Sequence, residues 1–312
     1  MKRLFFLLLL SVFLVSCNPR QPIYEETRFL MDTVCTIRAG GDSKSAVHDA
    51  FALVEEIQAS VNLYSPDSTI TRINRAKAGE PVPLDNHTAS ILSVALAVSQ
   101  ASDGAFDVTV APLSILWPFH GEESPQPPEH IAIQNALPHV GYDKLILDQN
   151  TQTVTKTDDG VSVDLGGAAK GYAADCAVQI LKDAGVPYAI LDFGGTIYVY
   201  GHNPNRHDGV WQIGIQDPHG TAGSYRTTVS VSEGAVVTSG TYQRNFVYDG
   251  RLYHHILNPK TGYPADSGLA SVSIQADSAL VADCLSTACL VQNQGDALVR
   301  QFGGTLVAAY DK

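Results

Sequence analysis

The sequence predicts an α+β fold, in one large domain that combines a mainly antiparallel sheet with interspersed helices. The chain has 312 residues, of which 45% are hydrophobic and 17% charged, and this composition suits a globular protein with a sizeable core. Short strand patterns separated by tight turns, such as Asp249-Gly250, are typical of antiparallel hairpins. Helical patterns do not alternate with strands regularly enough for a doubly wound parallel sheet.

Hydrophobic spacing places the individual elements along the chain. Apolar residues from Val47 to Val61 recur at helical spacing and predict the first helix. Further helices are expected over residues 88–100, 129–137, 168–184 and 278–291. Strands are expected over residues 144–148, 153–157, 161–165, 188–192, 196–201, 211–216, 227–231, 245–248, 252–257, 270–274 and 305–310.

Residues 1–16 are expected to form a lipoprotein signal peptide. The charged start MKR precedes the apolar run LFFLLLLSVFLV, which is too short for a confident membrane span. The sequence LVSC, ending at Cys17, resembles the bacterial lipoprotein box, in which the cysteine is lipidated and becomes the mature N-terminus. A plain secretory signal is the alternative. Residues 17–23 would then be a tether, and residues 24–312 a domain held by lipid at the periplasmic face of a bacterial membrane.

Charge and cysteine content restrict the possible partners. The net charge of −12 argues against nucleic acid, because duplex binding needs a basic surface. An acidic protein that handles a polyphosphate would instead need a local cation such as a metal ion. The cysteines other than Cys17 show no zinc-type spacing, and buried free thiols are favoured over a disulfide. They are Cys35, Cys176, Cys284 and Cys289.

The segment VDLGGAAKG is the first candidate for chemistry. Its glycines and lysine have neither the spacing of a Walker loop nor that of G-x-G-x-x-G. The glycines would let a ligand approach the backbone closely, and the helix that begins after them favours an anion at its N-terminus. Lys170, in the first helical turn, needs a negative neighbour, which is either Asp164 or a bound phosphate.

Asp283 and Thr287 form the second candidate. They lie four residues apart on a predicted helix and therefore point to the same side. Apolar neighbours indicate that this helix is buried, and a buried aspartate needs a partner. A carboxylate with a hydroxyl suits Mg²⁺ rather than zinc. In the structural alternative, Asp283 caps a neighbouring loop and Thr287 bonds to the backbone of its own helix.

His254 and His255 form the third candidate. Neighbours on a strand face opposite ways, so only one of them can line a pocket. That histidine could be a general acid or base, although a structural role is the alternative. The segments GAFDVT and TSG place further small polar groups at the ends of elements.

These segments, in this order, resemble the FAD:protein FMN transferases, also called ApbE flavin transferases. The resemblance runs from about Phe29 to the C-terminus, through LMDTVC, GAFDVTVAPL, VDLGGAAKGYAAD, LDFGG, VVTSGTYQR, HHILNPKTGYP and ADCLSTA. It implies an ApbE-type, T-fold-like architecture with FAD as substrate and Mg²⁺ as cofactor. It also implies transfer of FMN through a phosphoester to a threonine of a partner redox protein, with release of AMP.

The resemblance also implies roles for individual residues. The metal site falls on the backbone carbonyl of Gly167 and the side chains of Asp283 and Thr287. His255 falls on the family's site histidine, and His255 and Asp283 are both candidates for the base that activates the threonine. The candidate FAD-binding residues are Met31, Tyr64, Ala105, Phe106, Asp107, Asp164, Lys170, Ser239 and Ile256.

Two other functions remain open at this point. With water in place of the threonine, the same site would be a Mg²⁺-dependent pyrophosphatase that splits FAD into FMN and AMP. The second alternative is a lipid-anchored protein that binds flavin without catalysing a reaction. Two departures from the family pattern, Asn258 in place of an aspartate and Thr196 in place of an acidic residue, concern the pocket rather than the metal ligands.

Overall fold

The computed structural model describes residues 23–119, 121, 123–221, 223–293 and 295–312. The expected signal peptide, the lipidation site Cys17 and all but the last residue of the tether lie outside these ranges. Across the described ranges, none of the helices combines the length and apolar character needed to cross a membrane.

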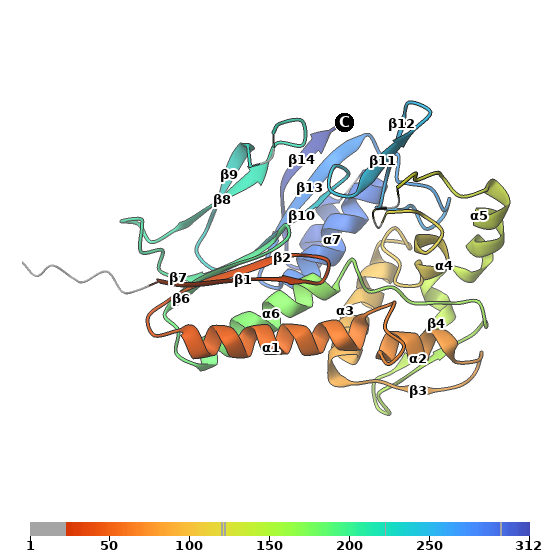
Figure 1. The fold of residues 1–312 in the computed structure, drawn as a ribbon, viewed down its shortest axis with the longest axis horizontal. Coiled ribbons are helices and arrows are strands. Elements are labelled where there is room, and N and C mark those ends of the chain that lie inside the picture. Colours follow the sequence, from red (N-terminus) through yellow and green to blue (C-terminus); the bar gives the residue numbers. More distant parts are fainter. Residues whose placement is uncertain (1–22, 120, 122, 222, 294) are drawn as a thin grey trace, which may run out of the picture.

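A seven-stranded sheet forms the centre of the molecule, and every neighbouring pair of its strands is antiparallel (Figure 1). This confirms the predicted α+β class. In spatial order the strands are β1 (Ile23–Leu30), β2 (Thr33–Gly40), β6 (Tyr188–Phe193), β7 (Thr196–Gly201), β10 (Gly234–Gly240), β13 (Leu269–Ala276) and β14 (Thr305–Asp311).

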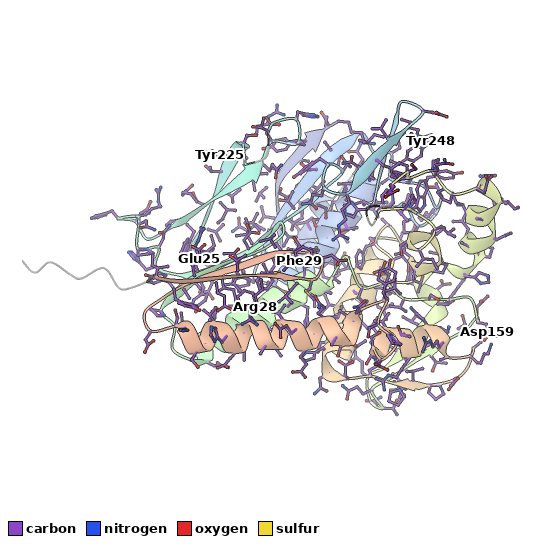
Figure 2. The ribbon with its side chains drawn as sticks, in the orientation of Figure 1. Glu25, Arg28, Phe29, Asp159, Tyr225 and Tyr248 are labelled. Carbon is purple, nitrogen blue, oxygen red and sulfur yellow. The ribbon has the colours of Figure 1, made fainter. Side chains whose placement is uncertain are left out.

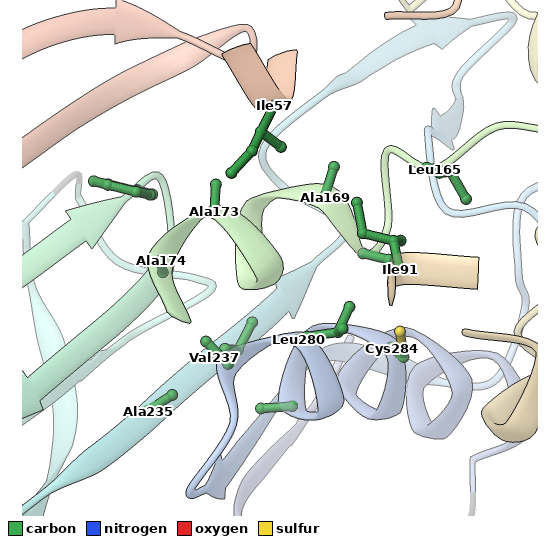
Figure 3. Close-up of a cluster of buried hydrophobic side chains, with 14 of the residues drawn as sticks. Ile57, Ile91, Leu165, Ala169, Ala173, Ala174, Ala235, Val237, Leu280 and Cys284 are labelled. Atoms are coloured by element: carbon green, nitrogen blue, oxygen red, sulfur yellow. The ribbon is translucent and has the colours of Figure 1, made fainter. Parts of the chain in front are cut away.

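Helices cover one face of this sheet and enclose the main core. They are α1 (Lys44–Val61), α3 (Asn86–Ala101), α6 (Ala169–Asp183) and α7 (Ala279–Gln292). Figure 3 shows α6 between Ile57 of α1 and Leu280 of α7, with Ala169 and Ala173 among the small side chains that α6 presents to this core. Small residues let helices pack closely, so α6 can lie against α1 and α7 at once.

The opposite face of the sheet is covered by a hairpin of β8 (Trp211–Gln216) and β9 (Tyr225–Val231). A third group of elements packs around the buried Trp117. It comprises α4 (Ala111–Ser114), α5 (His130–Ala136), η1 (Leu137–His139), β11 (Asn245–Tyr248) and β12 (Arg251–His254). The remaining elements are α2 (Thr69–Arg75), β3 (Val82–Pro83), η2 (Tyr142–Lys144), β4 (Leu145–Asp148), β5 (Thr153–Lys156) and α8 (Asp296–Gln301).

The prediction of a strand over residues 161–165 is wrong. In this segment only Ser162 makes a bridge, an isolated parallel one to Val110. Side chains hold it in place of a ladder: the Asn74 amide donates to the Val163 carbonyl (3.1 Å) and accepts from the Val163 N–H (2.7 Å), while Lys156 donates to the Val161 carbonyl (2.8 Å). The alternating sequence VSVDL therefore did not show that this segment has no partner strand in a sheet.

The expectation of free thiols is confirmed. Cys35, Cys284 and Cys289 are buried and Cys176 is partly buried, and all four are unpaired. Burial raises the pKa of the Cys35 and Cys289 thiols to about 12, so these groups pack as small apolar side chains.

Candidate functional site

Asp164 shapes the glycine loop that precedes α6. One carboxylate oxygen accepts from the Gly166 N–H (2.8 Å) and the other accepts from the Ser114 hydroxyl (2.9 Å). The Asp164 N–H in turn donates to the Val108 carbonyl (2.8 Å). The hydrogen bonds of Asp164 therefore position the loop, and the structure does not pair this residue with Lys170.

Asp283, in the second turn of α7, is the negative partner of Lys170. Its side chain is buried, and its Oδ2 atom accepts from the Gly171 N–H (3.0 Å) and lies 3.3 Å from Lys170 Nζ. Burial raises the pKa of Asp283, and the Lys170 ammonium opposes this shift. Part of the structural alternative is thus correct, because Asp283 does cap an element of another segment. That element is the first turn of α6.

Thr287 lies one turn after Asp283 and faces the glycine loop. Its Oγ1 atom is 3.1 Å from the Ser239 hydroxyl, which also lies 2.8 Å from the hydroxyl of Ser286. A Cβ atom placed on Gly167 would lie 3.9 Å from Thr287 Oγ1 and only 3.1 Å from the Phe106 ring. Gly167 and Thr287 therefore lie close to each other, and Asp283 lies one helical turn before Thr287 on α7.

The atoms gathered here suit a hard divalent cation. They are carboxylate, hydroxyl and backbone carbonyl oxygens, which are the ligands that Mg²⁺ prefers. The Lys170 ammonium already lies among such atoms, 3.3 and 3.5 Å from the two Asp283 oxygens and 3.5 Å from the Gly166 carbonyl. Within the described ranges no three His, Cys, Asp or Glu side chains cluster to hold a metal.

His255 is held in one orientation by the backbone of Arg244. Its N–H donates to the Arg244 carbonyl (3.0 Å), and its ring Nδ1 lies 3.3 Å from the same oxygen. Because a carbonyl only accepts, a hydrogen bond here requires the ring proton on Nδ1, and the tautomer that makes this bond has an unprotonated Nε2. Burial lowers the pKa of His255 to about 3, and the nearby Arg244 and Lys170 charges act in the same direction. His255 is therefore neutral near pH 7.

His254 and His255 have different partners, although β12 ends at His254 and the strand expected over residues 252–257 is therefore too long. His254 is buried, and its Nε2 atom is 3.0 Å from the Ala265 carbonyl. Burial lowers the pKa of His254 to about 4. Of the two histidines, only His255 lies near the charges of the Lys170–Asp283 pair.

The turn between β1 and β2 reaches the same region. Met31 and Asp32 both have positive φ angles, 53° and 56°, which are unusual for residues with side chains. The Asp32 carbonyl accepts from Arg244 Nη2 (2.9 Å), and the Met31 N–H donates to the Gln58 side chain. Arg244 thus connects this strained turn to His255.

The other candidate FAD-binding residues differ in what they can offer a ligand. Phe106 lies beside Gly167, whereas the buried carboxylate of Asp107 is used internally by the Thr109 N–H (2.8 Å), the Thr109 hydroxyl (2.6 Å) and the Tyr142 N–H (2.8 Å). Burial raises the pKa of Asp107. Ala105 and Ile256 are buried, and Tyr64 is exposed on the turn after α1.

Sequence reasoning missed several residues that organise this site. Arg244 supports His255, Ser286 bonds to Ser239, and Asp175 binds the N-terminus of α7. Arg244 and Asp175 lie inside the quoted segments VVTSGTYQR and VDLGGAAKGYAAD. The signal that could have drawn attention to Asp175 is a carboxylate on a helix otherwise rich in small apolar residues.

The fold and the site together define a class of protein: an antiparallel α+β domain in which a glycine loop faces an Asp-x-x-x-Thr pair on a buried helix. The sequence model of the ApbE family matches residues 31–308, and the chain belongs to that family.

Characterised relatives agree with this assignment. The chain is 32% identical over 309 residues to an FAD:protein FMN transferase of Treponema pallidum, covering 93% of this chain and 85% of the relative. It is 30% identical to one of Klebsiella pneumoniae, covering 85% and 81%. Among solved structures, the ApbE protein of Thermotoga maritima superimposes with a TM-score of 0.81 at 34% identity, covering 93% and 97%. The apo flavinyl transferase ApbE of Pseudomonas stutzeri gives 0.78 at 29% identity, covering 93% and 90%.

Proposed function

We propose that the protein transfers the FMN moiety of FAD to a threonine hydroxyl of a partner redox protein, in a Mg²⁺-dependent reaction that releases AMP. The convergence of Gly167, Asp283 and Thr287 at the mouth of α6 carries this proposal. The names of the relatives, FAD:protein FMN transferase, support the choice of donor and transferred group.

The residues of the chain have separable tasks in this reaction. Asp283, Thr287 and the Gly167 carbonyl would hold Mg²⁺, and Lys170 can turn from Asp283 to a phosphate oxygen. When bound, the metal ion neutralises the pyrophosphate and stabilises the departing AMP. The threonine oxygen forms a bond to the FMN phosphorus as the bond to the bridging oxygen breaks.

The threonine proton needs an acceptor, because a hydroxyl is a weak nucleophile. The unprotonated Nε2 atom of His255 is one candidate. Asp283 is the other, although its carboxylate also binds Lys170 and the Gly171 N–H. Substitution of His255, followed by rapid-mixing measurement of the transfer step at saturating Mg²⁺, tests the first candidate, because substitution of Asp283 would also remove the proposed metal ligand.

The location of the reaction is part of the proposal. Lipid on Cys17 would hold the domain at the periplasmic face of a bacterial membrane, and the acceptor would be a redox subunit exposed on the same side. The motifs MKR, the apolar run and LVSC support this placement.

The test is mass spectrometry of an acceptor domain incubated with the protein, FAD and Mg²⁺. The expected result is an acceptor heavier by one FMN on threonine, with an equal amount of AMP and no product when EDTA is present. A parallel reaction without acceptor is the control. AMP and free FMN in that control would favour the pyrophosphatase, and unchanged FAD in both reactions would favour a binding protein.

A further inference from the structure

Helices α6 and α7 touch each other backbone to backbone beside the candidate metal site. A Cβ atom on Gly171 of α6 would lie 2.3 Å from the Ala279 carbonyl oxygen and 2.7 Å from the Leu280 Cα atom of α7. Such distances leave no room for any side chain at position 171. The separation of the two helices is therefore fixed where Lys170 and Asp283 meet.

Each of these helices binds the N-terminus of the other through a carboxylate. Asp283 of α7 accepts from the Gly171 N–H at the start of α6 (3.0 Å). Asp175 of α6 accepts from the first two amides of α7, Ala279 N–H (2.7 Å) and Leu280 N–H (3.1 Å). The helices run antiparallel, because Asp175 is four residues after Gly171 while Ala279 is four residues before Asp283.

The interaction of Asp175 with α7 is extensive. Its Oδ2 atom also accepts from the Ser278 hydroxyl (2.7 Å), and Ser278 in turn caps α7 by accepting from the Val281 N–H (3.3 Å). Asp175 and Ser278 thus satisfy the three amides that begin α7, which have no partner inside the helix. The negative charge also lies at the positive end of the helix dipole.

We propose that Asp175 is a positioning residue for the metal-binding side chains, which fixes α7 along α6 so that Asp283 and Thr287 face Gly167. The inference rests on the proposed function for its metal. Asp283 binds the start of α6 and Asp175 binds the start of α7. These two contacts are about one helical turn, or about 6 Å, apart along the helix pair. A shift of α7 by one residue, about 1.5 Å, would break the hydrogen bonds to both carboxylates and move the ligands away from the glycine loop.

The test compares Asp175→Ala and Asp175→Asn with the unmodified protein. Mn²⁺ is titrated in the presence of FAD and without acceptor, and the free ion is measured by electron paramagnetic resonance. Asp175→Ala should weaken Mn²⁺ binding about 10-fold, which is typical when residues supporting a metal ligand are lost. Asp175→Asn keeps one acceptor oxygen and its volume, so its loss should be smaller.

Asp85→Ala is the matched control. Asp85 caps α3 by accepting from the Thr88 N–H (2.9 Å) and hydroxyl (2.7 Å), so its removal also costs a helix cap. Thermal unfolding should show a comparable loss of stability in Asp85→Ala and Asp175→Ala, with Mn²⁺ affinity changed only in the latter.

The outcomes separate the inference from the proposed function. If both Asp175 variants bind Mn²⁺ with unchanged affinity but unfold at a lower temperature, Asp175 only stabilises the start of α7. This result would overturn the inference and leave the proposed function unaffected. If Asp175→Ala does not fold, Asp175→Asn decides by the same criterion. An unmodified protein that binds Mn²⁺ and FAD but modifies no acceptor would overturn the function and leave the role of Asp175 standing.

Discussion

Asp283 combines a structural and a chemical task that one substitution can separate. Its carboxylate accepts from the buried Gly171 N–H and pairs with Lys170, and it is the only charged group proposed to hold the metal. Asparagine keeps the size of the side chain and an oxygen for the Gly171 N–H. Alanine removes both and leaves buried donors without a partner, which costs about 1–3 kcal/mol of stability.

We therefore expect Asp283→Asn to fold nearly as stably as the unmodified protein but to lose transfer activity by more than about 100-fold, since even changes around a ligand typically cost 10- to 100-fold. Asp283→Ala should lose both activity and stability. Acceptor flavinylation and urea unfolding measure the two effects. Substantial transfer by Asp283→Asn at ordinary Mg²⁺ concentrations would contradict the metal assignment.

Because His254 and His255 have lowered pKa values, we expect the free energy of unfolding to fall in mild acid. Burial lowers the pKa of His254 to about 4 and that of His255 to about 3, below the ordinary value of about 6.5 in an unfolded chain. At a pH between the lowered and the ordinary pKa, each histidine is protonated in the unfolded state and neutral in the folded state. Their contribution is therefore complete above about pH 6.5 and declines below it, by up to about 1.4 kcal/mol per pH unit for each histidine.

Urea unfolding at pH 7.5, 6 and 5 measures this dependence. His254→Gln can still donate to the Ala265 carbonyl but has no proton to gain, so its stability should decline less steeply below pH 6.5. Identical slopes for the variant and the unmodified protein would show that His254 does not contribute to acid sensitivity.

At the scale of single residues, the sequence predicted the identity of the site side chains better than their partners. Asp283 was expected to be buried and paired, but its partners Lys170 and Gly171 are more than 110 positions away in the chain. Only the packing of α6 on α7 determines that pairing. The same holds for Asp164, whose nearest sequence neighbour of opposite charge, Lys170, is not its partner.

At the scale of elements, helices with a continuous apolar face were predicted well. The ends of α1 and α6 lie close to those expected because apolar spacing is unambiguous over four or five turns. The ends of α7 also lie close to those expected, although this helix is buried nearly all round. β1 was missed because Glu25, Glu26 and Arg28 make both faces of this edge strand polar. β10 was missed as a strand because nearly all its residues are buried and show no alternation.

The contact between α6 and α7 gives a prediction at this scale. Gly171→Ala would place a methyl group against the Ala279 and Leu280 backbone, which cannot move aside as a side chain can. We expect a loss of about 1–3 kcal/mol from overpacking, together with weaker Mn²⁺ binding in the presence of FAD. Thermal unfolding and metal titration provide the measurements. If Gly171→Ala is as stable as the unmodified protein, α6 and α7 are not in tight contact at this position.

For the whole molecule, the proposed anchor can be tested independently of the chemistry. Cys17→Ser removes the thiol that would carry lipid, so the variant should leave the membrane fraction when expressed in a bacterium. The purified domain of residues 24–312 should flavinylate an acceptor equally well, since the described sheet and site begin at β1. Retention of Cys17→Ser in the membrane, resistant to carbonate, would indicate another mode of attachment.

The course of β1 has a practical consequence. The described chain begins at Ile23, at one end of this strand, and the turn that contacts Arg244 beside His255 lies at the other end, about 27 Å away for eight residues (Figure 1). Phe29, near the turn, and Glu25, near the start, mark the two ends of this path in Figure 2. A bead or sensor chip coupled to a domain that begins at Ile23 would consequently lie at the end of β1 remote from Arg244 and His255, so the immobilised domain can be used to capture macromolecules from solution.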